Sequence, residues 1–345
     1  MSKQLAVITN SAMSTYRRCP REYRYLYVDG YRARADEEAL RIGTLIHAGL
    51  ELWWQGAELA DVLVVCEQAA DAYEAAKLRV MLIGYDARWA GERESFAVRG
   101  VEAEFRAPLI NPASGAPSRT YELGGKVDVL LDRGIVEHKT TSAEIGPGSV
   151  YWQKLALNSQ VSTYFAGSRS LGVEPSVCVY DVLRKPSQRP CQVPLVDEAG
   201  FKIVLDADGQ RVYCKTPNKG GAKPRETADS KLGYVLQTRP ETPEEYEARL
   251  TEEVAGNPAR YYQRGDIVRL EHEEREYAED TWLLTQAIRE AERAGAFVRN
   301  TDACERFGGM CSFWPVCSGE ASIDDESRFV RVENKHPELS AVVAA

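Results

Sequence analysis

The sequence predicts an α/β fold in which a mixed central sheet is flanked by helices, with further helices at the N-terminal end. Three segments carry this prediction. Residues 98–109 (VRGVEAEFRAPL) alternate as a strand does, residues 124–141 read mostly as a β-hairpin, and residues 176–185 (SVCVYDVLRK) are typical of a buried strand. An amphipathic helix is expected at 151–172, which gives the order strand, strand, strand, helix, strand.

Composition and charge narrow the class of protein. The chain has 345 residues, of which 44% are apolar, so it can bury one large core, and we expect one elaborated domain. It has no run of about 18 apolar residues, and its start, MSKQLAVITNSAMS, lacks the features of a signal peptide. We therefore expect a cytoplasmic protein. The net charge of −9 argues against bulk electrostatic coating of nucleic acid, although a local basic groove or a bound metal can still hold phosphates.

Helices are expected on both sides of these strands. Residues 11–29 are expected to form a short helix that is broken near Cys19-Pro20, because proline interrupts a helix. The loop NPASGAPSRT at 111–120 is expected to turn the chain before the hairpin. The remaining elements are helices at 44–54, 58–80, 81–91, 242–255 and 273–294, and a strand-like segment at 266–272.

Residues 186–240 differ from the rest of the chain, since prolines, glycines and polar residues dominate there. Between Lys202 and Lys231, seven basic residues stand against four acidic ones. We expect a long loop or a small hairpin insertion that binds a nucleic-acid strand, with Tyr213 and Tyr234 available for stacking on bases. A solvated loop explains the same composition equally well.

The hairpin at 124–141 brings three charged residues together. Its first strand is expected to place Val127, Val129 and Leu131 on one side, and the turn Asp132-Arg133-Gly134 leads into the second strand. Asp128 then lies roughly opposite Glu137. Because side chains alternate along a strand, Glu137 and Lys139 share a face and His138 points the other way.

Two interpretations of this charged hairpin remain open. A solvent-exposed hairpin with a surface ion pair would gain only about 0–1 kcal/mol from that pair. Alternatively, the carboxylates hold a divalent cation, because Mg²⁺ prefers an oxygen-rich shell and Mn²⁺ accepts the same shell plus an imidazole. That second arrangement suits phosphodiester hydrolysis, with Lys139 beside the metal-bound water.

Four short motifs resemble the RecB-type branch of the PD-(D/E)XK nucleases. G-x-x-D is followed nine residues later by E-x-K, with a helical G-x-x-x-H upstream and Q-x-x-x-Y downstream. In this chain they are GKVD at 125–128, EHK at 137–139, GTLIH at 43–47 and QVSTY at 160–164. The resemblance covers about residues 40–185 and implies a restriction-endonuclease-like (PD-(D/E)XK) core.

The resemblance also implies a role for each motif residue. Asp128 and Glu137 would hold Mg²⁺ or Mn²⁺, with the His138 carbonyl as a third ligand and His47 as an additional one. Lys139 would organise the attacking water. The helical pair at 160 and 164 would support the site or touch a phosphate or base; its members are Gln160 and Tyr164.

Some of these residues also have plainer explanations. Taken alone, His47 would be a core histidine, and its position in the motif order is what favours a ligand. Ordinary packing explains Tyr164 nearly as well as a role in the site. Glu102, on the preceding strand, falls where these nucleases often carry an acidic residue, but a surface glutamate is the more economical view.

Three cysteines lie close together near the C-terminal end of the expected domain, and a fourth lies near the start of the chain. CERFGGMCSFWPVC carries Cys304, Cys311 and Cys317, and YRRCPREY carries Cys19. Zinc sites usually use close C-x₂₋₄-C knuckles, so this spacing favours a [4Fe–4S] cluster over zinc, with no metal as the last alternative. The layout resembles the iron-staple nucleases of the same branch, such as the AddB nuclease domain and the CRISPR-associated RecB-like exonucleases. The other four are expected in the core: Cys66, Cys178, Cys191 and Cys214.

The expected organisation is a single nuclease domain at 1–320 followed by a flexible tail at 321–345. Within the domain we expect an N-terminal helical part at 1–40, a catalytic core at 41–185, a basic insertion at 186–240 and a helical, cluster-binding part at 241–320.

The resemblance implies a metal-dependent DNA exonuclease that acts on linear or single-stranded ends in recombination, repair or phage DNA processing. The expected partners are DNA and recombination or single-strand-binding proteins. Two other functions stay open: a non-catalytic iron–sulfur DNA-binding or assembly module with a nuclease-like fold, and a zinc-stabilised interaction protein.

Overall fold

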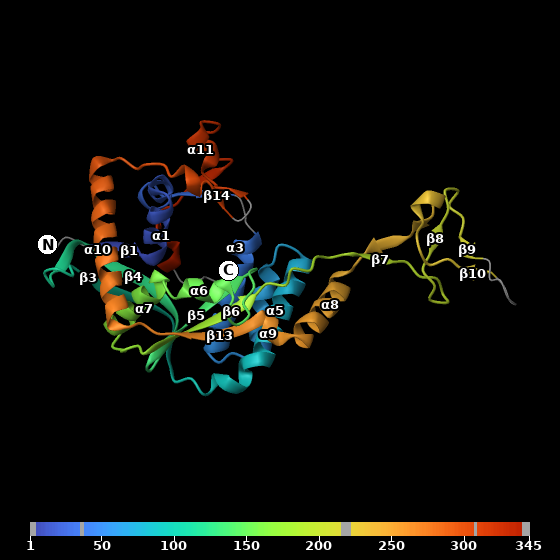
Figure 1. Cartoon of the computed structure of the whole chain (residues 1–345), viewed down its shortest axis with the longest axis horizontal. Helices are drawn as coiled ribbons and strands as arrows, with labels where there is room; N and C mark the ends of the chain where they lie inside the picture. Colours follow the sequence, from blue (N-terminus) through green and yellow to red (C-terminus); the bar gives the residue numbers. More distant parts are fainter. Residues whose placement is uncertain (1–4, 35–37, 215–221, 307–308, 340–345) are drawn as a thin grey trace.

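A mixed six-stranded sheet forms the centre of the molecule (Figure 1). The computed structural model describes residues 5–34, 38–214, 222–306 and 309–339. The sheet order is β1-β4-β5-β6-β13, and β3 pairs with β4; the β1–β4 and β5–β6 pairs are parallel and the others antiparallel. The strands are β1 (Ala6–Thr9), β3 (Val98–Ile110), β4 (Pro117–Leu131), β5 (Gly134–Thr141), β6 (Val177–Arg184) and β13 (Tyr262–Ile267). The predicted α/β class with a mixed central sheet is confirmed.

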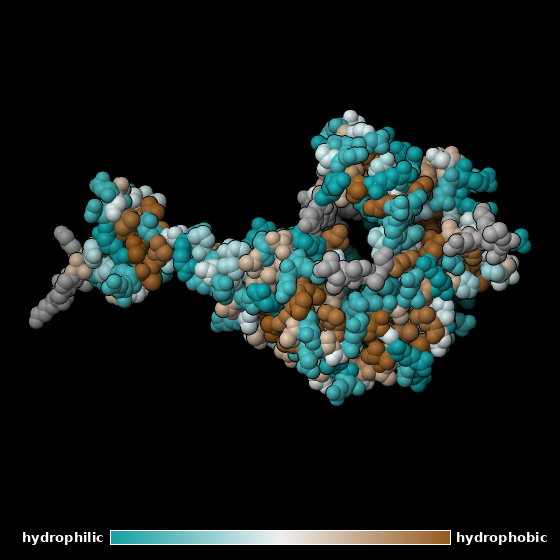
Figure 2. Space-filling view, turned by 180° about the vertical axis from the view of Figure 1, so that it is seen from behind, coloured by the Kyte–Doolittle hydropathy of each residue, from teal (hydrophilic) through white to brown (hydrophobic). Residues whose placement is uncertain are grey.

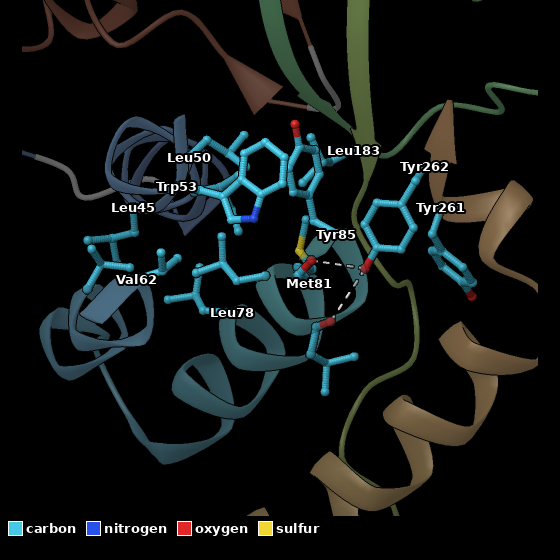
Figure 3. Close-up of a cluster of buried hydrophobic side chains, with 14 of the residues drawn as sticks. Leu45, Leu50, Trp53, Val62, Leu78, Met81, Tyr85, Leu183, Tyr261 and Tyr262 are labelled. Atoms are coloured by element: carbon cyan, nitrogen blue, oxygen red, sulfur yellow. Dashed lines mark hydrogen bonds between the residues drawn. The ribbon is translucent and has the colours of Figure 1, made fainter. Parts of the chain in front are cut away.

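Helices cover both faces of the sheet and bury a separate core on each (Figure 1). One core lies under α1 (Asn10–Arg18), α7 (Ser159–Ser170) and α10 (Glu271–Ala294). The other lies under α3 (Glu38–Trp54), α5 (Ala72–Arg93), α8 (Pro243–Gly256) and α9 (Pro258–Tyr261). Figure 3 shows this second core, in which Tyr262 donates a hydrogen bond to the Met81 carbonyl at 3.0 Å and so ties β13 to α5. No helix within the described ranges has the length and apolar character needed to cross a membrane.

Two predicted helices are broken where a polar side chain caps a new one. The stretch 58–80 divides into α4 (Leu59–Val62), a 3₁₀ turn η2 (Leu63–Gln68) and the start of α5. Asp71 accepts hydrogen bonds from the N–H groups of Tyr73 and Glu74 and begins α5, which then continues through the expected boundary at 80. Likewise the stretch 151–172 divides into α6 (Val150–Leu155) and α7, which Asn158 caps.

The two ends of the chain pack together. The chain continues from α1 through α2 (Pro20–Tyr23) and a π-helical turn η1 (Arg24–Val28) to β2 (Tyr31–Ala33), which pairs antiparallel with β16 (Phe329–Arg331). Tyr25, Phe313 and Phe329 form a small buried core there, next to α11 (Trp314–Ser318). The expectation of a loose tail from residue 321 is therefore wrong for residues up to 339, because this apolar contact and strand pairing hold them. Residues 340–345 lie outside the described ranges.

The described residues of the segment 186–241, namely 186–214 and 222–241, form an arm that projects from the body (Figure 1). Its stalk is the antiparallel pair β7 (Gln192–Pro194) and β12 (Thr238–Pro240). Beyond the stalk, two short antiparallel pairs form a distal module: β8 (Val204–Leu205) with β11 (Val235–Leu236), and β9 (Tyr213–Cys214) with β10 (Lys223–Pro224). Of the two predicted forms, loop or hairpin insertion, the described residues adopt the hairpin.

Candidate active site

The candidate site lies in a gap in the sheet. β1 pairs with β4 as far as Gly124, and β5 pairs with the same edge of β4 only at Val129 and Leu130. Residues 124–126 and Asp128 of the intervening edge line a cavity of about 480 Å³. A side chain at Gly125 would place its Cβ 2.5 Å from the Phe105 ring, so the close contact of β4 with β3 requires glycine there.

Strand β4 changes face at Asp128. Residues two apart in a regular strand share a face, but Val127 packs in the core beside α7, whereas Val129 packs in the core beside α5. The prediction that Val127 shares a side with Val129 and Leu131 is therefore wrong. On β3, Glu102 lies between the positions paired with Val127 and Val129 and has a φ of 52°. A non-glycine residue in this region costs of order 1–3 kcal/mol, and such strain concentrates at functional sites.

Two buried carboxylates meet at this gap. Asp128 is 9% exposed and Glu137 is 1% exposed. The N–H of His138 donates a hydrogen bond to Asp128 Oδ2 at 2.7 Å, and His47 Nδ1 lies 3.7 Å from the same oxygen. Lys139 Nζ forms an ion pair with Glu137 Oε1. The three charges therefore converge, and the surface ion-pair interpretation of the hairpin is excluded by their burial.

Helix α7 contributes the fourth motif. Gln160 Nε2 donates to Glu137 Oε1 at 2.8 Å and to the Tyr164 hydroxyl at 2.8 Å. The spacing of four residues puts both side chains on one face of α7, as predicted. The cavity is lined by six predicted site residues, namely His47, Asp128, Glu137, Lys139, Gln160 and Tyr164.

Burial controls the ionisation of the carboxylate pair. Desolvation raises the pKa of Asp128 to about 7, and Lys139 only partly opposes this. Desolvation and the neighbouring Asp128 likewise raise the pKa of Glu137 to about 7. Burial lowers the pKa of His47, and the charge on Lys139 adds to this effect. Desolvation also disfavours charge on Lys139, but the two carboxylates outweigh it and raise its pKa overall.

The donor set fits a hard divalent cation. Glu137 Oε2 is buried and has no hydrogen-bond partner among the described residues. This acceptor oxygen has therefore lost its contact with water without gaining a donor from the protein. Two carboxylates and an imidazole are donors that Mg²⁺ and Mn²⁺ accept. Across the described ranges, no group of three or more His, Cys, Asp or Glu side chains is already arranged as a metal site.

A comparison with protein families agrees with this geometry. A family model described as the PD-(D/E)XK nuclease superfamily matches residues 7–318. The chain belongs to this superfamily. Its members are metal-dependent nucleases that usually use Mg²⁺ or Mn²⁺. No curated protein sequence matches the chain significantly.

The side chain of this nuclease's His138 lies on the opposite face of the sheet from Glu137, as the alternation predicts. Its Nδ1 is 3.6 Å from Asp181 Oδ2. Asp181 is fully buried and accepts hydrogen bonds from Tyr85 at 2.6 Å and from Arg264 Nε at 3.1 Å. Arg264 also lies over the Trp89 ring, 4.1 Å from its centroid. Sequence reasoning missed this cluster, although an aspartate inside the apolar strand VCVYDVLR was a visible signal.

The lining of the nuclease cavity includes charged residues that were not predicted as site residues, among them Lys126, Lys185 and Glu338. Lys126 pairs with Glu102 across β3 and β4, so the glutamate that seemed a surface residue faces the site. Lys185 follows β6 directly. Glu338 reaches the cavity from the C-terminal segment and accepts a hydrogen bond from Thr9 at 2.5 Å.

The four predicted cluster cysteines lie around one second site. They line a cavity of about 300 Å³ between the N-terminal helices and the last segment; they are Cys19, Cys304, Cys311 and Cys317. Burial raises the pKa of Cys317, and the nearby Cys19 and Cys304 thiols add to it. Of the cysteines expected in the core, Cys66 and Cys178 are buried, but Cys191 and Cys214 are exposed because they belong to the arm.

Proposed function

We propose that this nuclease is a Mg²⁺- or Mn²⁺-dependent deoxyribonuclease of the RecB-like branch, which digests linear or single-stranded DNA from its ends. The observation that carries the proposal is the gap between β1 and β5, where Asp128, Glu137 and Lys139 meet with one carboxylate oxygen unpartnered among the described residues. Recombination, repair or phage DNA processing is the proposed context, with single-strand-binding or recombination proteins as partners.

The site residues have distinct proposed roles. Asp128 and Glu137 would hold the divalent ion, together with the His138 carbonyl and His47. Such an ion supplies Lewis acidity and lowers the pKa of bound water. Lys139, which is paired with Glu137, places a positive charge beside the position where the phosphate develops negative charge. Gln160 orients Glu137 through its hydrogen bond.

We also propose a [4Fe–4S] cluster held by four thiolates. The support is that Cys19 reaches the same cavity as the three C-terminal cysteines although nearly the whole chain separates them. All-thiolate ligation suits such a cluster, and zinc remains the alternative metal. The cluster would tie the first helices to the last segment around the nuclease core.

Changing Cys311 to Ala tests the cluster. We expect loss of the absorbance near 400 nm and a clear fall in the melting temperature, because metal binding is coupled to folding of the chain ends. Anaerobically purified protein with and without the substitution would be compared by absorbance, iron analysis and thermal unfolding. Changing the exposed arm residue Cys214 to Ala is the control. An unchanged spectrum in the Cys311 variant would refute the assignment. If the unchanged protein is colourless and contains zinc, the four cysteines bind zinc and no iron–sulfur cluster.

Digestion of end-labelled DNA tests the enzyme. Anaerobically purified protein would be incubated with linear and closed circular DNA, each with Mg²⁺ or Mn²⁺. We expect metal-dependent loss of linear substrate and survival of the circle. Cleavage of the circle would make the protein an endonuclease. No cleavage of either DNA would favour the non-catalytic module.

A further inference from the structure

We propose that the arm formed by residues 186–241 binds the sugar–phosphate backbone of the substrate strand outside the catalytic cavity. This inference rests on the proposed function, because it takes the substrate to be DNA. Figure 1 shows the arm as a narrow stalk that carries the distal module away from the body. Four observations support the proposal: where the arm begins, how its root is held, how charge is distributed, and what its distal module exposes.

The arm begins at the rim of the catalytic cavity. β6 ends at Arg184, and the next residue, Lys185, lines both the catalytic cavity and a neighbouring cavity of about 680 Å³. The first arm residues, 186–190, line this second cavity together with two ion pairs of the body, Arg41–Glu74 and Lys77–Glu38. A strand that leaves the catalytic cavity past Lys185 therefore runs along the root of the arm.

The root of the arm is held by an ion pair whose carboxylate is buried. Glu241 is 3% exposed, and Arg249 of α8 donates to both of its carboxylate oxygens at 2.8 Å. The N–H of Cys191 donates to the same carboxylate at 3.1 Å, so both ends of the arm are tied to one point. Tyr73 of α5 donates to the Glu241 carbonyl at 2.5 Å. The stalk is therefore anchored to α5 and α8, unlike a flexible linker.

Charge is separated between the arm and the body. Residues 186–241 contain nine Lys or Arg and seven Asp or Glu, a net charge of +2. The rest of the chain contains 34 basic and 45 acidic residues, a net charge of −11. A polyanionic strand is repelled by the summed charge of the body, and the arm is the segment that offsets this repulsion.

The distal module exposes cations and an aromatic ring together. Tyr213 on β9 is 54% exposed, and its strand pairs with β10, where Lys223 lies opposite Cys214. Lys202, Lys223 and Lys231 make no ion pair with a carboxylate within the described residues, whereas Arg211 and Arg225 are each paired with an aspartate of the module; the two pairs are Arg211–Asp197 and Arg225–Asp229. Exposed lysines and an exposed ring on one module are features that can hold a single strand without sequence preference.

The second aromatic residue of the module is less accessible than Tyr213. The guanidinium of Arg225 lies 5.2 Å from the centroid of the Tyr234 ring and covers it. Tyr234 is half-buried and is engaged by this cation, so Tyr213 is the more exposed of the two rings. Figure 2 shows a brown, apolar patch on the projecting end. The exposed apolar side chains of the module include Val196, Leu232 and Val235.

A shortened arm tests the proposal directly. Pro194 pairs with Thr238 at the end of the stalk, so an Asn-Gly turn can replace residues 195–237 and close a two-residue hairpin. We expect the KM for a long single strand of about 40 nucleotides to rise about tenfold. The kcat/KM for an oligonucleotide of about five nucleotides should stay within about twofold, because so short a substrate does not reach the module. Thermal unfolding of the body is the folding control.

Lysine substitutions test the electrostatic part. A triple variant, Lys202→Gln, Lys223→Gln and Lys231→Gln, should lower the slope of log K against log salt by about 2 for single-stranded DNA, since each phosphate contact contributes about 0.7. The matched control removes the same charge from exposed arginines of the body that do not line either cavity: Arg99→Gln, Arg293→Gln and Arg328→Gln. Its salt slope should match that of the unchanged protein.

Binding measured without cleavage separates this proposal from the proposed function. Fluorescence anisotropy of a labelled strand would be recorded in metal-free buffer, so that binding is measured without cleavage. If the full chain cleaves DNA but the shortened arm leaves KM, affinity and salt slope unchanged, the arm does not bind substrate. That result would favour a protein partner as the ligand of the arm. If the full chain cleaves nothing yet the shortened arm loses DNA affinity, the proposed function fails and the arm proposal stands.

Discussion

The two faces of strand β5 carry buried charge in opposite ways. On one face, the charge of Asp181 is balanced by Arg264 and aromatic rings enclose the pair, although Asp181 Oδ1, like Glu137 Oε2, has no hydrogen-bond partner among the described residues. On the other face, Asp128 and Glu137 lie side by side, Lys139 is paired with Glu137, Lys126 is paired with a further acid, Glu102, and the group borders an open cavity. A buried charge with a matched partner stabilises or specifies a fold, whereas an excess of buried negative charge requires a cation from outside. The difference identifies the second face as the place for chemistry.

Removing charge from the open face should have the largest effect on function. We expect Asp128→Ala or Lys139→Ala to abolish metal-dependent cleavage, a loss of at least about 10³-fold, because each removes a group from the reacting region. Folding should be retained, as should the absorbance near 400 nm that the proposed cluster would give. Cleavage assays and circular dichroism would check both results. Asp132→Asn, in the exposed turn of the same hairpin, is the control and should cleave normally.

Removing charge from the face that carries Asp181 and Arg264 should instead lower the free energy of unfolding. Arg264→Leu would leave Asp181 buried without its cation, and such a loss costs about 3–5 kcal/mol. Urea unfolding measures this. The double variant Arg264→Leu with Asp181→Leu should recover much of the stability, since no unpaired charge remains. Equal stability of the single variant and the unchanged protein would mean that the two faces do not differ in the way described.

The pH dependence of the metal-free protein sharpens the same contrast. The pKa of Asp128 and of Glu137 is raised from 3.8 and 4.5 to about 7, so folding favours their protonated forms. This contribution is fully present below about pH 4 and is lost as the pH rises through about 7. The melting temperature should therefore fall by several degrees between pH 5 and pH 8. Asp128→Asn should flatten the profile, and an equally steep profile in that variant would contradict the assignment.

The smallest expected effect concerns the strained residue beside the open face. Glu102→Gly removes the cost of a positive φ and also the ion pair with Lys126, so we expect stability to rise by at most about 1 kcal/mol. Glu102→Ala is the matched control, because it loses the same ion pair but keeps the strain. If the two variants have equal stability in urea, the backbone at this position is not strained.

Local patterns predicted much of the site. The hairpin turn, the alternation that separates Glu137 from His138, and the helical spacing of Gln160 and Tyr164 all follow from periodicities of two and of 3.6 residues. The order of the motifs then placed His47 beside them. Each of these inferences needs only residues close in sequence or a short motif.

Long-range packing could not be read in the same way. The face switch at Asp128 depends on β1 and β5 sharing one edge of β4, which no local pattern encodes. Arg264 and Asp181 are 83 residues apart and meet only because β13 pairs with β6. The strand at 329–331 is too short to show a period, and its pairing with β2 depends on the apolar contact around Phe329.

Calorimetric titration of Mn²⁺ into the protein at pH 8 tests the central claim most directly, because it measures the cation at the carboxylate pair without requiring cleavage. We expect binding at the pair to be present in the unchanged protein and in Asp132→Asn, and to be lost in Asp128→Asn. Undiminished Mn²⁺ binding by Asp128→Asn would show that the gap between β1 and β5 does not hold the catalytic cation.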